Sequence, residues 1–296
     1  MIVMKFGGAS LADSSDILRS VEVIKNYSRN HSVILVVSAM KGVTNQLYDI
    51  AENIKKKRLK KALQHIDGLK KAHVTTLYKL QSAQPAITES KLVHLFSRLD
   101  NFIRYIAKHQ ITEAQIDFIV SVGERLSGNL MAESLNAQGI TACSIDTSYV
   151  IATDDSFGNA LPLPQKYQTH IQDILCPLIN SNIIPIVSGF VGFAPDGRIT
   201  TLGRGGSDLS ASYLAYLFDA HGLYLWKDVN GIYSDDPHRN INARFHKKLS
   251  YDQAARMAKN GAKIIYHKAI HYVKKKKIPI YVKNYKNPHL PGTIVC

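Results

Sequence analysis

A lysine followed by two glycines marks the first segment that could do chemistry, Lys5-Phe-Gly-Gly-Ala-Ser10, which comes directly after a short run of β-forming residues. Glycines at the end of a strand let backbone N–H groups approach a phosphate closely. Lys5 would lie at the mouth of that turn, where an ammonium group can offset the charge of a phosphoryl group in transfer. The same residues also fit an ordinary turn that ends a strand.

A second segment, Thr201-Leu-Gly-Arg-Gly-Gly-Ser-Asp208, combines three glycines with an arginine just before a predicted helix. Ser207 or Asp208 can serve simply as the N-cap of that helix. Capping does not explain Arg204, which stands between two glycines. An exposed arginine on a Gly-rich loop is suited to bind a carboxylate through two parallel hydrogen bonds, so this loop predicts a site for an acidic ligand.

A third polar segment, Trp226-Lys-Asp-Val-Asn-Gly-Ile-Tyr-Ser-Asp-Asp-Pro237, follows a strand-like run. Its composition is typical of a loop, and it can also border the base and ribose of a nucleotide. His267 and His271 are four residues apart and could hold a metal on one helix face, but no third ligand lies nearby in the sequence. We therefore expect no metal site made by protein side chains.

The segments that must position these loops alternate between β-type and helical patterns. Continuous β-branched runs indicate strands buried on both faces, and apolar residues three and four positions apart indicate helices with one buried face. The predicted strands are Ile2–Phe6, Ser32–Val37, Ile183–Val187, Leu223–Trp226, Ile278–Val282 and Thr293–Val295. The predicted helices are Ile17–Tyr27, one long stretch over Asn45–Leu80, Leu92–Ile106, Ile119–Asn136, Ser207–Asp219 and Tyr251–Lys259.

This alternation predicts an α/β protein with a mostly parallel central sheet that is covered by helices on both faces. We expect a three-layer αβα sandwich in two lobes of one compact unit, because the chain contains neither an internal repeat nor a flexible linker. Ligands of such sheets bind outside the carboxyl ends of the strands, at Gly-rich turns. The polar loops are therefore expected to meet at one edge of the sheet.

The composition is that of a basic globular chain. Of its 296 residues 45% are hydrophobic and 20% charged, and 37 Lys and Arg against 23 Asp and Glu leave a net charge of +14. Part of this charge lies in two runs, Lys55–Lys61 and Lys274–Lys277. We interpret them as solvated helix faces, because neither is interleaved with the aromatic residues of a base-stacking surface. We expect no nucleic-acid partner.

The sequence also indicates the cellular compartment. The longest apolar stretches, Val33–Val37 and Ile183–Ala194, are shorter than the roughly 20 residues that span a bilayer, and the N-terminus has no charged leader before an apolar region. Three scattered cysteines form no disulfide framework, which favours a reducing compartment. We expect a cytoplasmic protein with no membrane partner.

An ordered set of motifs across most of the chain resembles the aspartate kinases of the amino acid kinase family. The segment Lys5–Ser10 is similar to that family's Lys-Phe-Gly-Gly-Thr-Ser, and Ser121–Ser127 is similar to its Gly-Glu helix. The resemblance rests on the order and spacing of the whole set, since one such motif alone is weak. The other matching segments are Val37–Asn45, Gly189–Gly192, Leu202–Asp208, Asp228–Tyr233, Gly261–Lys263, Ile278–Ile280 and Pro291–Ile294.

The resemblance implies transfer of the γ-phosphoryl group of Mg-ATP to the side-chain carboxylate of L-aspartate, giving 4-phospho-L-aspartate, the first step of aspartate-family amino-acid biosynthesis. ATP and Mg²⁺ are the implied cofactors. Both reactants are anions, so the site must supply positive charge and exclude water. By this likeness Lys5 stabilises the transferring group, Asp208 holds Lys5 and the glycine turn in place, and Lys263 acts on the ATP phosphates.

The resemblance also implies which residues contact the two substrates. Arg204 would bind a substrate carboxylate, Glu124 the α-ammonium group, and Thr44 would add a hydroxyl contact. Ser38 and Ser207 complete the expected substrate-binding set. The expected ATP-binding residues are Lys5, Gly7, Gly8, Ser10, Lys227, Asp228, Tyr233, Lys263 and Ile264.

Several of these residues also have simpler structural interpretations. Glu124 can be an exposed helix residue paired with Arg125, and Thr44 can be a helix N-cap. Lys263 can offset a helix dipole, and Ser38 can be a strand-end hydroxyl.

Departures from the family pattern concern mainly the nucleotide side. Ala9 replaces the usual Thr, which removes a hydroxyl beside the phosphates. The family's Asp-Pro-Arg is Asp236-Pro-His-Arg239 here, so an arginine contact to ATP is lost or shifted by one position. Tyr266-His-Lys stands where Leu-His-Pro is common. None of these changes removes a charge that is central to transfer.

The chain ends where the family's regulatory domains usually begin. We expect a single catalytic domain over residues 1–296 without them, no inhibition by lysine or threonine, and a homodimer. A substrate lobe is expected over 1–190, including the helical region 45–110, and a nucleotide lobe over 191–296. Two alternatives stay open: a kinase of the same fold with another carboxylate acceptor, such as glutamate or acetylglutamate, and a non-catalytic nucleotide-binding or regulatory protein.

Overall fold

A wide, mostly parallel β-sheet forms the centre of the computed structural model, which describes residues 1–80, 85–146, 150–164, 169–235, 240, 242–260 and 265–296. Neighbouring strands pair in parallel except for the antiparallel pair β11–β12. The predicted α/β class with a mostly parallel sheet is confirmed. In spatial order the strands are β10 (Lys248–Leu249), β12 (Thr293–Val295), β11 (Ile280–Asn284), β7 (Leu223–Lys227), β1 (Ile2–Phe6), β2 (Val33–Val37), β4 (Ile184–Ser188) and β3 (Ala142–Ile145).

Helices cover both faces of this sheet. Met4 and Phe6 of β1 belong to one apolar cluster, whereas Val3 belongs to a second cluster on the opposite face. Because both faces are buried, β1 and β2 need apolar residues at nearly every position, which explains their continuous apolar runs. The first cluster includes α1 (Ser14–Ser28), α2 (Val43–Lys55), α3 (Leu59–Lys79), α4 (Pro85–Ile106) and α5 (Glu113–Ala137), and the second includes α6 (Thr169–Asn180), α7 (Gly206–Leu217), α8 (Tyr251–Lys259) and α9 (His267–Lys275).

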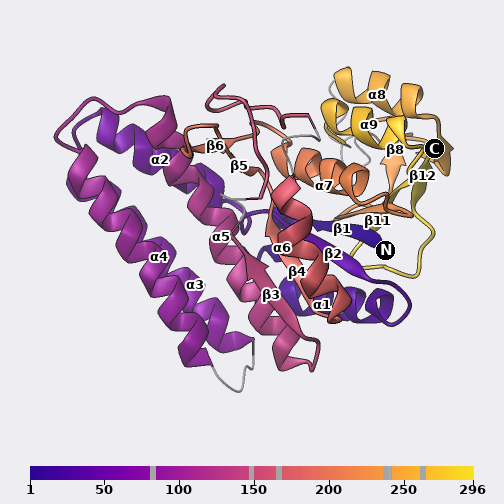
Figure 1. Cartoon of the computed structure of the whole chain (residues 1–296), viewed down its shortest axis with the longest axis horizontal. Coiled ribbons are helices and arrows are strands. Elements are labelled where there is room, and N and C mark those ends of the chain that lie inside the picture. Colours follow the sequence, from indigo (N-terminus) through magenta and orange to yellow (C-terminus); the bar gives the residue numbers. More distant parts are fainter. Residues whose placement is uncertain (81–84, 147–149, 165–168, 236–239, 241, 261–264) are drawn as a thin grey trace.

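Two groups of helices lie at opposite ends of the molecule. Figure 1 shows α2, α3 and α4 together at one end and α8 and α9 at the other. Short antiparallel pairs, β5 (Val191–Phe193) with β6 (Ile199–Thr201) and β8 (Ile232–Tyr233) with β9 (Phe245–His246), lie outside the main sheet. The pattern along the sequence did not predict these pairs, nor β3 and β10, because elements of a few residues carry too little periodicity. The longer helices α6 and α9 were also not predicted; α6 contains Pro177, a residue that normally ends a helical pattern.

The helical stretch predicted over residues 45–80 is wrong as a single element, because the structure divides it into α2 and α3. Lys57 adopts a φ of 56°, and the Arg58 N–H donates to the carbonyl of Asn53 at 2.7 Å. A left-handed residue with a backbone bond of this kind is a common way to end a helix. The helix predicted from Ile119 begins earlier, at Glu113, because Thr112 and Gln115 form a capping box there.

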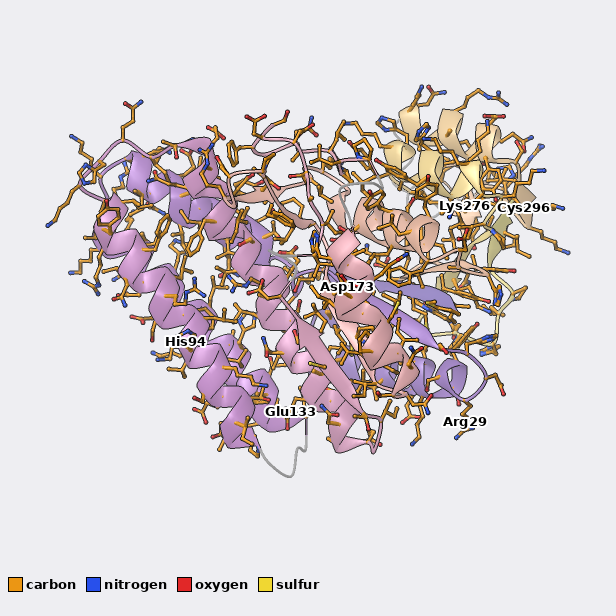
Figure 2. All side chains as sticks on the ribbon, in the orientation of Figure 1. Arg29, His94, Glu133, Asp173, Lys276 and Cys296 are labelled. Carbon is orange, nitrogen blue, oxygen red and sulfur yellow. The ribbon has the colours of Figure 1, made fainter. Side chains whose placement is uncertain are left out.

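Both basic runs lie mainly at the surface. Lys55, Lys56, Lys57 and Arg58 are exposed at the junction of α2 and α3, and the second run closes α9, with Lys276 at its end (Figure 2). These positions agree with their interpretation as solvated helix faces. Among the described residues, no helix combines the length and the apolar character that a membrane crossing requires.

Replacing the N-cap of α5 tests how strongly that helix is anchored. Thr112→Ala removes the side chain that accepts from the Gln115 N–H, and we expect it to lower the free energy of unfolding by about 1 kcal/mol. Urea denaturation measures the change. Thr75→Ala, at an exposed position within α3, is the matched control and should not destabilise. Equal stabilities of the two variants would show that the cap contributes nothing.

Candidate active site

The end of β1 places a lysine at the carboxyl edge of the sheet. Lys5 lies between β2 and β7 in the sheet register and is only 8% exposed. A Cβ added to Gly7 would lie 3.4 Å from Lys5 Nζ, and one added to Gly8 would lie 3.2 Å from the Ala39 carbonyl oxygen. The two glycines therefore keep the space beside the ammonium open and let the turn pack against the segment after β2.

The Gly-rich loop before α7 brings a carboxylate to that ammonium group. Gly203 and Gly205 have φ values of 68° and 79°, which glycine adopts without strain. Gly205 is the N-cap of α7 and no side chain caps it, so the interpretation of Ser207 or Asp208 as the N-cap is wrong. Asp208 instead lies in the first turn, with Oδ1 at 2.8 Å from Lys5 Nζ.

A second lysine shares the same carboxylate. Lys227, the last residue of β7, has its Nζ 3.7 Å from Asp208 Oδ2. Burial by itself raises the pKa of Asp208, but the Lys227 and Lys5 ammonium groups outweigh it and lower that pKa to about 2. Burial lowers the pKa of Lys227, against the opposing influence of Asp208. Two cations and one anion leave an excess positive charge, which suits an anionic ligand.

A buried glutamate on α5 faces the same region. Glu124 is 3% exposed, and its Oε1 accepts from the Ala39 N–H at 3.2 Å. Oε2 has no hydrogen-bond partner among the described residues, and burial raises the pKa of Glu124 to about 8. Arg125 pairs with Asp146 at 2.5 Å, so the alternative of an exposed Glu124–Arg125 pair is wrong. The orphaned oxygen is suited to accept from a ligand's ammonium group.

Lys5, Asp208 and Glu124 line one cavity of about 390 Å³, whereas Lys227 pairs with Asp208 and is not part of its lining. Arg204 is exposed on the Gly-rich loop at its rim. Thr44 lies in the first turn of α2, whose N-cap is Gly42, so its alternative role as an N-cap is wrong. The predicted site residues that the structure brings together here are Lys5, Ser38, Thr44, Glu124, Arg204, Ser207 and Asp208, joined by Tyr48 and Phe190.

Most of the predicted nucleotide-binding residues that the structure describes do not line this cavity. The buried Ser10 hydroxyl donates to the Gly7 carbonyl at 2.8 Å, which closes the turn. Asp228 is exposed directly after β7, and the Tyr233 ring meets that of Phe245 edge to face at 5.3 Å. None of these three lines the cavity. Lys263 and Ile264 lie outside the described residues, as do Asp236, His238 and Arg239.

An aspartate that no sequence motif indicated anchors the Arg204 loop. Asp117, 1% exposed, accepts from the Thr201 N–H at 2.8 Å, the Thr201 hydroxyl at 2.7 Å and the Gly158 N–H at 2.9 Å. Burial raises the pKa of Asp117, and these hydrogen bonds oppose the increase. Its spacing of seven residues from Glu124, which puts both acids on one face of an apolar helix, is the signal that could have found it.

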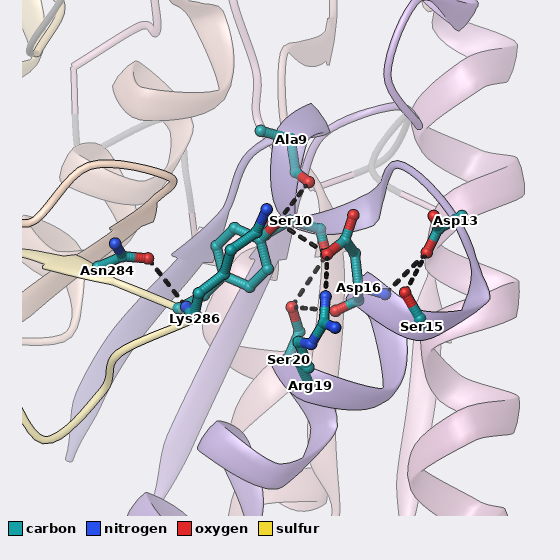
Figure 3. A network of polar contacts seen from close by, with 10 residues as sticks. Ala9, Ser10, Asp13, Ser15, Asp16, Arg19, Ser20, Asn284 and Lys286 are labelled. Atoms are coloured by element: carbon teal, nitrogen blue, oxygen red, sulfur yellow. Dashed lines mark hydrogen bonds and ion pairs between the residues drawn. The ribbon is translucent and has the colours of Figure 1, made fainter. Parts of the chain in front are cut away.

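A tyrosine after β11 anchors the glycine turn and was also missed. The Tyr285 hydroxyl lies 3.0 Å from the Ala9 carbonyl and 2.9 Å from Asp16 Oδ1, and its backbone N–H donates to the Lys227 carbonyl at 3.0 Å. Figure 3 shows Ala9, Asp16 and Arg19 in this network. A single aromatic residue near the C-terminus gives no sequence signal of such a contact, which only the sheet order creates.

The raised pKa of Glu124 has a measurable consequence for stability. Its pKa rises from 4.5 to about 8 in the folded protein, so the folded state retains a proton that the unfolded chain has lost. The free energy of unfolding should therefore fall, relative to Glu124→Gln, as the pH rises from about 5 to about 8. Urea denaturation of both proteins across this range measures the difference, and a difference independent of pH would contradict the shift.

Known proteins are similar to this chain along nearly its whole length. The model of the amino acid kinase family matches residues 1–284. The chain is 32% identical over 297 residues to "Lysine-sensitive aspartokinase 3" of Escherichia coli, an alignment that covers 100% of this chain and 64% of that protein. It is 31% identical over 298 residues to "Aspartokinase 1, chloroplastic" of Arabidopsis thaliana, covering 99% and 51%.

Solved structures share the fold. The E. coli aspartokinase III in complex with aspartate and ADP matches with a TM-score of 0.91 and 30% identity, over 100% of this chain and 64% of that one. An isopentenyl phosphate kinase matches with a TM-score of 0.59 at 15% identity, over 99% of both chains, which is a likeness of fold alone. This chain thus spans about half to two thirds of the aspartokinases it matches.

Proposed function

The chain belongs to the amino acid kinase family, and we propose that it transfers the γ-phosphoryl group of ATP to the side-chain carboxylate of L-aspartate, giving 4-phospho-L-aspartate and ADP. One observation carries the proposal: a single cavity combines the Lys5–Asp208 ion pair with Glu124 and Arg204. The first two suit a phosphoryl group, and the last two suit the ammonium and carboxylate groups of an amino acid. The aspartokinase III structure with aspartate and ADP, at a TM-score of 0.91, supports it.

Charge neutralisation is the main task of the site in this reaction. An oxygen of the aspartate side chain forms a bond to the γ-phosphorus, while the bond from that phosphorus to the β–γ bridging oxygen breaks and ADP leaves. Lys5 Nζ would lie against the transferring group, and Lys227 adds a second positive charge beside Asp208. Asp208 would act as a positioning residue that holds both ammonium groups, because its low pKa keeps it ionised.

Other groups that line the cavity would select an amino acid with free ammonium and carboxylate groups. Arg204 would bind the α-carboxylate through two hydrogen bonds. Glu124 Oε2, which lacks a partner among the described residues, would accept from the α-ammonium. The hydroxyl groups of Ser38, Thr44 and Ser207 would orient the acceptor. An acylated acceptor would leave Glu124 without its cation, so this pairing favours aspartate over N-acyl amino acids.

The nucleotide would lie over the glycine turn. Backbone N–H groups at Gly7 and Gly8 would contact its phosphates, with Lys227, Asp228 and Tyr233 beside it. Among the described residues no three His, Cys, Asp or Glu side chains form a metal-binding group, and Asp208 is held by two lysines. Mg²⁺ would therefore enter as part of the Mg-ATP substrate, held by phosphate oxygens and water. Roles for Ser10, Lys263 and Ile264 toward ATP stay predictions.

Two further expectations stay proposals. The cavity draws residues from both predicted lobes, with Lys5 and Glu124 from 1–190 and Arg204 and Asp208 from 191–296, so we propose that it lies where the lobes meet. We also propose a homodimer; Tyr105 of α4 is 68% exposed and provides apolar surface on the helical region.

Trapping the acyl phosphate tests the reaction and its catalytic lysine. With Mg-ATP and hydroxylamine, aspartate should give a hydroxamate, and Lys5→Ala should lower kcat by about 10²–10³, the scale of losing one electrostatic stabiliser. Lys60→Ala, at an exposed position on α3, is the control and should retain full activity. A panel with glutamate and N-acetylglutamate identifies another acceptor. A loss below tenfold for Lys5→Ala would show that this lysine does not contact the transferring group.

Proton release on substrate binding tests the role of Glu124. In the free protein most Glu124 carboxyl groups are protonated at pH 7, because their pKa is about 8. A bound ammonium group favours the carboxylate, so aspartate should displace this proton into the buffer. Calorimetry at pH 7 in two buffers of different ionisation enthalpy counts the protons released. Release that persists unchanged in Glu124→Gln would assign it to another group.

A further inference from the structure

A second cavity, of about 530 Å³, lies beside β3 and β4 and shares no lining residue with the first. Its walls come from α4, α5, the end of β3 and the last residue of β4. Because β3 and β4 are parallel, their carboxyl ends place Asp146 and Ser188 on the same edge of the sheet that carries the candidate active site. The sequence motifs did not point to this cavity, and the proposed phosphoryl transfer makes no use of it.

Basic side chains outnumber acidic ones in its lining. Lys91, His94 and Arg98 are spaced i, i+3 and i+7 along α4, so they share one helix face, and all three are exposed; His94 lies midway along α4 (Figure 2). Arg125 contributes from the facing helix α5. The acidic member, Asp146, already pairs with Arg125, which leaves the charges of Lys91 and Arg98 in excess.

The inner end of the cavity offers buried polar donors. Ser188 is fully buried, and its hydroxyl has no hydrogen-bond partner among the described residues. A Cβ added to Gly128 would lie 2.7 Å from Ser144 Oγ and 3.5 Å from Ser188 Oγ, so the glycine leaves both hydroxyl groups room. Arg125 has a side chain only 9% exposed, and among the described residues one of its five N–H donors is used, toward Asp146. Unsatisfied buried donors favour a ligand that accepts hydrogen bonds.

We propose that this second cavity binds a small anion through carboxylate or phosphate oxygens. Lys91, His94 and Arg98 attract the anion at the mouth, while Arg125 and the Ser188 hydroxyl donate to its oxygens inside. The geometry of guanidinium groups suits planar or tetrahedral oxyanions that accept two parallel hydrogen bonds. A cation or an apolar ligand would meet excess positive charge and leave the buried donors unpaired, so neither fits.

Residues that are neighbours in the chain line the two cavities. Arg125 follows Glu124 on α5, and the Ser127 hydroxyl donates to the Ser38 carbonyl at 2.6 Å. Ser188 precedes Gly189, where an added Cβ would lie 2.8 Å from the Cβ of Ser207. An anion held by Arg125 and Ser188 would therefore lie against side chains one residue along the chain from Glu124 and from Gly189, which packs against Ser207. Binding should be measured directly, because an effect on turnover alone would not locate the ligand.

Calorimetric titration with inorganic phosphate and with succinate, each against sodium chloride of equal ionic strength, tests the proposal and distinguishes the two oxyanion classes. At least one of them should bind, and Arg98→Ala and Ser188→Ala should each weaken it roughly tenfold, the scale of one charge-assisted or buried hydrogen bond. Gly128→Ala, which fills the inner end, should weaken it as well. Arg104→Ala, on the same helix but outside the cavity and paired with Asp100, is the matched control and should leave the affinity unchanged.

The same titration on Arg204→Ala separates the two cavities and keeps this proposal apart from the proposed kinase function. Binding that survives Arg204→Ala but weakens in Arg98→Ala belongs to the second cavity, whether or not aspartate is phosphorylated. Binding lost only in Arg204→Ala belongs to the first cavity and overturns the proposal. No binding beyond the chloride control, or equal binding by Arg98→Ala and Arg104→Ala, also overturns it.

Discussion

The ion triad at the carboxyl edge of the sheet is the interaction on which the site depends. Asp208 joins two lysines from neighbouring strands, Lys5 of β1 and Lys227 of β7, at 2.8 and 3.7 Å. Two like charges this close repel, and the carboxylate between them offsets that repulsion. The triad therefore keeps an excess positive charge in a nearly buried place, where electrostatic interactions are stronger than in water. In the proposed reaction an incoming anion would complete the neutralisation.

The pKa values of two carboxyl groups in this cavity are shifted in opposite directions. Both are buried, yet the pKa of Asp208 falls to about 2 and that of Glu124 rises to about 8. The difference lies in their partners: two ammonium groups stabilise the Asp208 carboxylate, whereas Glu124 Oε1 accepts from a backbone N–H and its Oε2 has no hydrogen-bond partner among the described residues. Asp208 is thus ionised at neutral pH, whereas the Glu124 carboxylate would be stabilised by a bound cation. This contrast separates the phosphate side of the proposed reaction from the amino-acid side.

Residues outside the cavity hold these groups in place. Asp117 fixes Thr201 and so the start of the Arg204 loop, while Tyr285 links β11 to the turn that follows β1. Each draws backbone groups from segments far apart in the sequence, 84 residues for Asp117 and Thr201 and 276 for Tyr285 and Ala9. The loops can therefore be rich in glycine, which favours close approach to a ligand, and still keep one arrangement. The second cavity lies at the same sheet edge and takes Arg125 and Asn129 from α5, where Arg125 directly follows Glu124.

Local patterns along the chain were enough to predict the α/β class, the buried central strands, two glycine-rich loops and the polar loop after Trp226, because these depend on local periodicity and on residues typical of tight turns. The residue types also indicated Lys5 beside a phosphate and left Arg204 unexplained by helix capping, whereas a role for Asp208 came only from the resemblance to aspartate kinases. The folded arrangement shows that Asp208 pairs with Lys5, as the resemblance implied, and does not cap its own helix. It also shows that Glu124 is buried, with an oxygen that has no hydrogen-bond partner among the described residues. It alone revealed Asp117, Tyr285 and the second cavity. The physical reason is that ion pairing, burial and pKa depend on residues that lie far apart in the sequence and meet only in the sheet. Local sequence patterns do not determine the order of strands in that sheet.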